Sequence, residues 1–113
     1  MTDSRDLKDR TKRFAVRVIR MVDKLPRSTA SEAIARQLVK SATSIGANYR
    51  AACRGRSKPE FIAKLQIVLE ESDETQYWLE VIRELKWLSW EGLKPKYDEC
   101  GELLAIFSSI GKK

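Results

Sequence analysis

Histidine is absent from the 113-residue sequence, and its absence removes several kinds of active site at once. Ser-His-Asp and Cys-His catalysis lack their base, histidine-based zinc sites lack their ligands, and the Glu-x-x-His motif of di-iron bundles cannot form. Cysteine is nearly as scarce, because only Cys53 and Cys100 occur and their spacing is unlike that of a zinc site. We therefore expect a protein that is not an enzyme and that has no metal and no cofactor.

Long apolar runs are missing as well. No segment approaches the ~20 apolar residues that a membrane-spanning helix needs. The first residues are charged where a signal peptide would have its apolar segment. We expect a cytoplasmic protein without membrane contacts, whose two cysteines are free and buried rather than joined in a disulfide.

Glycine and proline are rare, with 5 and 3 residues respectively. This scarcity favours a few long helices over many tight turns. A chain of this length is expected to form one domain, covering residues 1–113.

Four segments repeat apolar residues every three or four positions, and they predict helices over 5–24, 30–53, 58–87 and 93–110. Thr29–Glu32 and Ser57–Glu60 have the pattern of a capping box at a helix start. Trp90-Glu91-Gly92 is expected to form the turn before the last helix. The fold class is therefore all-α, an up-down-up-down four-helix bundle. The predicted core rows are Leu7, Phe14, Val18, Val22 and Leu25; Ile34, Leu38, Ala42, Ile45, Tyr49 and Ala52; Phe61, Leu65, Val68, Ser72, Thr75, Leu79 and Ile82; and Leu93, Tyr97, Cys100, Leu104 and Phe107.

Positive charge is concentrated in the first half of the chain. Residues 1–58 contain 15 lysines and arginines against 5 acids, a net charge of +10, whereas residues 59–113 contain 7 against 11, a net charge of −4. Such a division is typical of a nucleic-acid-binding face, or of two halves that attract each other within or between subunits.

Basic stripes lie outside the apolar faces of the first two predicted helices. A stripe of this kind can be a solvated surface, a phosphate-contacting surface or a contact with an acidic neighbour. Lys24 belongs to the stripe on the first helix. The candidate nucleic-acid-binding residues are Arg10, Arg13, Arg17, Arg20, Arg36, Lys40, Arg50, Arg54, Arg56 and Lys58.

The predicted third helix has a second apolar arc beside its core row. A helix that is apolar on two sides needs two partners, which are either a neighbouring helix of the same bundle or another subunit. We expect a subunit interface, with the tryptophan as its anchor and the two glutamates paired with arginines. The candidate interface residues are Ile67, Glu71, Glu74, Trp78 and Leu85, with Leu88 at the end of the arc.

Residues 43–79 carry a resemblance to a known family. The motifs are Ser44-Ile45-Gly46-Ala47-Asn48, Arg56-Ser57-Lys58, Glu60-Phe61-Ile62 and Glu74-Thr75-Gln76-Tyr77-Trp78-Leu79. This stretch resembles the small bacterial proteins named for 23S rRNA intervening sequences, also described as "four helix bundle protein". The turn Ala52-Cys53-Arg54-Gly55-Arg56 is more basic than the family's usual turn.

The resemblance implies a four-helix bundle that assembles as a ring-shaped homopentamer. It also implies kinship with accessory proteins of diversity-generating retroelements, which are basic and bind nucleic acid and a reverse transcriptase. No catalytic residue follows from the resemblance.

Two hypotheses follow from the sequence. The leading one is a non-enzymatic oligomeric binding protein whose basic helices contact RNA or DNA phosphates. The alternative is a purely structural protein-protein interaction module, in which the basic stripes pair with acidic surfaces of sister subunits or of another protein.

Overall fold

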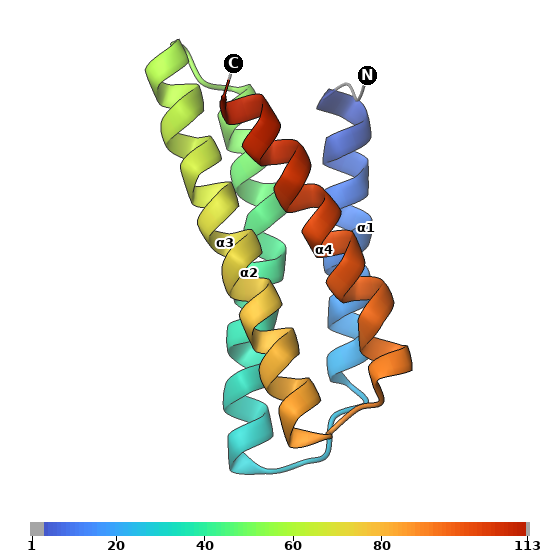
Figure 1. The fold of residues 1–113 in the computed structure, drawn as a ribbon. Coiled ribbons are helices and arrows are strands. Elements are labelled where there is room, and N and C mark those ends of the chain that lie inside the picture. The colour runs from blue at the N-terminus through green and yellow to red at the C-terminus, as the bar shows by residue number, and fades with distance from the viewer. Residues whose placement is uncertain (1–3, 113) are drawn as a thin grey trace.

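The computed structural model describes residues 4–112 of the chain. Within this range the chain forms the helices α1 (Ser4–Val22), α2 (Thr29–Cys53), α3 (Lys58–Leu85) and α4 (Trp90–Gly111). They pack side by side in an elongated bundle that measures 44 × 25 × 20 Å (Figure 1).

Each helix contacts the helices before and after it in the chain, and α4 closes the bundle against α1. The start of α1, the α2–α3 connection and the end of α4 lie at the same end of the bundle (Figure 1). This arrangement confirms the predicted all-α, up-down-up-down four-helix bundle. The α1–α4 contact is the loosest of the four neighbouring pairs.

The core is built from one buried row on each helix, largely as the apolar periodicity predicts. The rows on α2 and α3 are buried except for their first residues, Ile34 and Phe61, which are half-buried. On α4, Leu103 is buried where Leu104 was expected, and Tyr97 is only half-buried. A three-four or a four-three step from Cys100 to Phe107 fits the helical period equally well, so the sequence alone does not separate these two leucines.

The core row on α1 also differs from the prediction. Met21 is buried, whereas Val22 is only half-buried. Thr11 joins this row, because its hydroxyl donates to the Leu7 carbonyl at 2.7 Å and so needs no partner outside the helix.

Serines set the helix starts of α2, α3 and α4, and they correct two predicted boundaries. Ser28, not Thr29, caps α2, and a capping box with Ser31 completes this cap. Ser57 caps α3 as expected, but the Glu60 carboxylate accepts from the Arg56 amide, so that box is incomplete. Ser89 caps α4 and accepts from the Gly92 amide.

The turn between α3 and α4 is therefore placed earlier than predicted. Trp90, Glu91 and Gly92 form the first turn of α4 and not the connection. Helix α3 ends at Leu85, because Lys86 adopts the left-handed conformation with φ 59°. A residue in this conformation closes a helix by turning the chain away from its axis. The actual connection is residues 86–89.

Two hydrogen bonds between buried polar groups cross from one helix to another. The Thr75 hydroxyl on α3 donates to the Ser41 hydroxyl on α2 at 2.9 Å, and the Ser41 hydroxyl lies 3.1 Å from the Leu38 carbonyl that accepts from it. The Cys100 thiol on α4 donates to the Ser72 carbonyl at 3.2 Å. Burial, with smaller contributions from the charges of Glu99 and Asp73, raises the pKa of Cys100 to about 12. These contacts fix the register of α3 against both neighbours.

Candidate nucleic-acid interface

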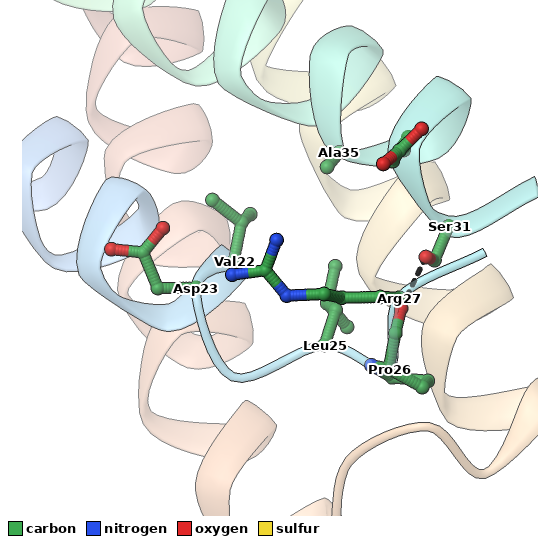
Figure 2. A pocket seen from close by; sticks show the side chains of 8 residues that line it. Val22, Asp23, Leu25, Pro26, Arg27, Ser31 and Ala35 are labelled. Atoms are coloured by element: carbon green, nitrogen blue, oxygen red, sulfur yellow. Dashed lines mark hydrogen bonds between the residues drawn. The ribbon is translucent and has the colours of Figure 1, made fainter. Parts of the chain in front are cut away.

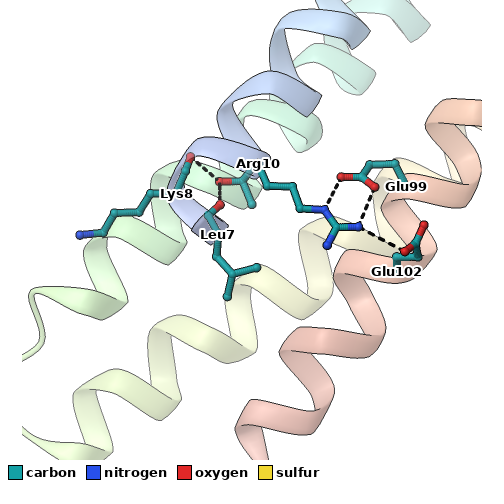
Figure 3. A network of polar contacts seen from close by, with 6 residues as sticks. Leu7, Lys8, Arg10, Glu99 and Glu102 are labelled. Atoms are coloured by element: carbon teal, nitrogen blue, oxygen red, sulfur yellow. Dashed lines mark hydrogen bonds and ion pairs between the residues drawn. The ribbon is translucent and has the colours of Figure 1, made fainter. Parts of the chain in front are cut away.

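Arg10 is held in an ion pair that bridges the seam between α1 and α4 (Figure 3). Its Nε donates to Glu99 Oε2 at 2.6 Å and its Nη2 donates to Glu99 Oε1 at 2.8 Å. A third contact reaches Glu102 at 3.3 Å. The hydrogen bond to Glu99 is the main cause of a raised Arg10 pKa. Arg10 is thus engaged inside the bundle, unlike the other cations that the sequence singles out.

The remaining basic residues of the α1 stripe run along the same side of the helix. We call Arg13, Arg17, Arg20 and Lys24 the α1 row; all four are exposed. Lys96 on α4 lies close to this row, because its pKa is lowered by burial and then by the positive charges of Arg17 and Lys24. Arg17 and Lys24 therefore lie on the side of α1 that is nearer to α4.

The basic residues at the end of α2 meet a different part of α1. Arg50 and Arg54 line an open hollow of about 400 Å³ together with Lys8, Asp9 and Lys12 of α1. We call this hollow the α1–α2 groove. Figure 3 shows that the Lys8 and Arg10 side chains extend to opposite sides of α1. The groove therefore lies on the other side of α1 from the Arg10 ion pair.

Lys8 and Lys12 are candidate site residues that the sequence pattern did not single out. They are one helical turn apart, and on a helical wheel they lie beside the arc of α1 that packs against α2. Their spacing is visible in the sequence. Only the fold shows that α2 is the helix that packs against this arc of α1.

The other candidates on and after α2 are all exposed: Arg36, Lys40, Arg56 and Lys58. Lys40 lies near enough to α3 that its charge acts on Glu71. Arg56 and Lys58 stand at the α2–α3 connection, at the same end of the bundle as the α1–α2 groove (Figure 1). The structure thus separates the α1 row from the α1–α2 groove, and it places Lys40 towards α3.

The second arc of α3 lies on the outside of the bundle. Ile67, Trp78 and the two glutamates are half-buried, and Leu85 is 48% exposed. The Trp78 Nε1 donates to Glu74 Oε2 at 3.2 Å. Burial is the main cause of a raised Glu71 pKa, followed by repulsion from Glu74, and Lys40 opposes both. The arc is therefore only partly covered by the chain's own helices.

A further hollow, of about 210 Å³, lies between the end of α1 and the start of α2 (Figure 2). The Ser31 hydroxyl donates to the Pro26 carbonyl at its edge. Its lining includes no residue of the predicted sites. Within residues 4–112 no group of cysteines and acids is arranged to hold a metal ion. No helix of the described range is long and apolar enough to cross a bilayer.

By its fold and charge, the protein is a small antiparallel four-helix bundle with a strongly basic first half. The chain belongs to the 23S rRNA-intervening sequence protein family, which it matches over residues 5–109. This confirms the resemblance found in the sequence.

One solved structure extends this relationship to nearly the whole chain. It is a crystal structure of a protein with unknown function from the S23 ribosomal protein family of Bacteroides thetaiotaomicron VPI-5482. The two chains are 34% identical, with a TM-score of 0.87 over 94% of this chain and 98% of that one. No curated protein matches the chain.

Proposed function

We propose that this protein is a non-enzymatic, self-assembling binding protein that contacts the phosphate backbone of RNA or DNA through the basic side chains of α1 and α2. The proposal rests on the ion pairing and the exposure of the ten candidate cations. Within residues 4–112, Arg10 alone among them has an ion-pair partner, and the other nine are exposed. The basic half of the chain is therefore not neutralised by its acidic half.

The family name supports an RNA ligand, because it refers to intervening sequences of 23S rRNA. Exposed lysines and arginines bind phosphates by displacing condensed counterions, a mechanism that does not depend on base sequence. We therefore propose backbone contacts without base recognition.

Binding to a short labelled single-stranded RNA of mixed sequence tests the proposal by fluorescence anisotropy. We expect a Kd of roughly 10⁻⁴ to 10⁻⁶ M at physiological salt, with log K falling linearly as log salt rises. The same DNA sequence should bind with a similar salt slope. An absence of binding even at low salt would contradict the proposal.

Self-assembly is proposed to use the second arc of α3, and the family resemblance implies five copies. Leu85→Glu should shift the protein towards the monomer, because it places a charge in an apolar contact. Ile62→Glu is the matched control: Ile62 is a 36% exposed apolar residue on the same helix but outside the arc. Sedimentation equilibrium measures both masses. A wild-type protein that is monomeric at high concentration would overturn this part of the proposal.

The purely structural alternative predicts a different result in the same experiment. If Arg36→Glu and Arg50→Glu break the assembly, the basic stripe contacts sister subunits. If the assembly survives while RNA affinity falls, the stripe contacts phosphates.

A further inference from the structure

The fold brings two pairs of cations together across the boundary of two antiparallel helices. Lys8 and Lys12 come from α1, and Arg50 and Arg54 come from α2. Within each pair the residues are one helical turn apart, which is about 6 Å along the axis. Two short rows of positive charge therefore line the two walls of the α1–α2 groove.

The close approach of α1 and α2 holds these rows near each other. A Cβ atom on Gly46 would lie 2.8 Å from the Thr11 Oγ1 and 3.2 Å from the Thr11 Cβ, so the backbones meet here without room for a side chain. Thr11 lies between Lys8 and Lys12 in the sequence, and Arg50 is one turn beyond Gly46. This close contact of the two helices is thus directly beside the groove.

The charge in the groove is not compensated by the protein. Four cations face one acid, Asp9, and within residues 4–112 none of the four is in an ion pair. Arg50, Arg54 and Lys12 are exposed, whereas Lys8 is half-buried. Uncompensated like charges on two packed helices repel each other, so an anion in the groove stabilises the arrangement.

The groove also continues beyond these residues. A second open hollow, of about 600 Å³, adjoins it and is lined by Ser4, Arg5, Lys8 and Asp9. The two hollows share Lys8 and Asp9. Two adjoining open hollows with cations along both fit a chain of phosphates better than one small anion.

The α1 row is a weaker candidate, although it contains the same number of cations. Arg10, which lies beside it, is already bound to Glu99 and Glu102, so acids are part of this seam. The α4 side of this seam adds one cation, Lys96, whereas each wall of the groove has two.

We propose that the α1–α2 groove, through Lys8, Lys12, Arg50 and Arg54, anchors the phosphodiester backbone of a nucleic acid, and that the α1 row contributes less to binding. This inference rests on the proposed function and specifies its site. Arg50 and Arg54 contact phosphates from one wall, and Lys8 and Lys12 contact them from the other.

Two variants that remove the same charge test the inference. The groove variant carries Lys8→Gln, Lys12→Gln, Arg50→Gln and Arg54→Gln. The row variant carries Arg13→Gln, Arg17→Gln, Arg20→Gln and Lys24→Gln. Because the net charge falls equally in both, a general loss of attraction affects them alike. Affinity for the labelled single-stranded RNA is measured across about 50 to 200 mM salt for both variants and the wild type.

We expect the affinity of the groove variant to fall at least about tenfold at low salt, and its salt slope to fall by about 0.7 for each phosphate that it no longer binds. The row variant should lose less affinity and less of the salt slope than the groove variant does. Equal losses of affinity in the two variants, or a larger loss in the row variant, would overturn the inference. A wild-type protein that does not bind RNA would instead overturn the proposed function itself.

Two further measurements complete the test, one with double variants and one with inorganic phosphate as a competitor. If the groove variant does not fold by circular dichroism, the Lys8/Lys12 and Arg50/Arg54 double variants are measured separately, and each should show about half of the slope change. Inorganic phosphate at matched ionic strength should displace the RNA no better than chloride does. Stronger displacement by phosphate identifies a site for a free anion and contradicts backbone anchoring.

Discussion

Gly46→Ala should lower the free energy of unfolding by about 1 to 3 kcal/mol, the usual cost of overpacking a close contact. The direction is opposite to helix propensity, by which alanine in a helix interior is better than glycine by roughly 0.5 to 1 kcal/mol. The reason is the 2.8 Å distance from the new Cβ to the Thr11 Oγ1. That hydroxyl is fixed by bonds to the Leu7 and Lys8 carbonyls, so α1 must move away from α2.

Urea unfolding of three variants measures this effect. Gly101→Ala is the matched control, because its Cβ would meet only the end of the flexible Gln76 side chain at 3.2 Å, and it should be neutral or stabilising. Thr11→Ala combined with Gly46→Ala should recover part of the stability, since the nearest clashing atom is gone. A Gly46→Ala protein that is as stable as Gly101→Ala would show that the helices separate at little cost.

The apolar pattern was sufficient to predict the fold. Heptad-like rows such as Leu65, Val68, Ser72, Thr75 and Leu79 define the buried face of α3 without ambiguity, and each of these residues is buried. The helix boundaries were less predictable. Ser89 follows Leu88 and precedes Trp90, so the apolar residues around it conceal a cap that only the backbone shows.

The candidate site was predictable in composition but not in arrangement. A helical wheel places Arg10 and Arg17 on one flank of α1 and Lys8 and Lys12 on the other. The wheel does not show that α4 packs beside the flank with Arg10 and Arg17. Nor does it show that α2 packs beside the flank with Lys8 and Lys12. That assignment depends on the Arg10–Glu99 ion pair and on the Thr11–Gly46 contact, which join residues far apart in the sequence. The sequence therefore combined two surfaces that the fold separates.

Arg10 joins the first of these flanks to α4 through its ion pair with Glu99. Arg10→Met should lower the free energy of unfolding by about 1 to 3 kcal/mol, the usual cost of leaving a buried hydrogen-bonding group without its partner. The side chains of Arg10 and Glu99 are only 26% and 17% exposed, so removal of the arginine leaves a poorly solvated carboxylate. The destabilisation is concentrated at the α1–α4 seam, which is the loosest boundary of the bundle.

Arg13→Met is the matched control, because it removes the same charge from an exposed position of the same helix. It should change stability by less than about 0.5 kcal/mol, as is usual for surface substitutions. The double variant Arg10→Met/Glu99→Met should recover most of the stability, since no unpaired charge remains in the seam. RNA affinity should be similar for Arg10→Met and Arg13→Met, because neither residue belongs to the α1–α2 groove. If Arg10→Met loses more free energy of RNA binding than free energy of unfolding, the Arg10–Glu99 ion pair opens and Arg10 binds phosphate.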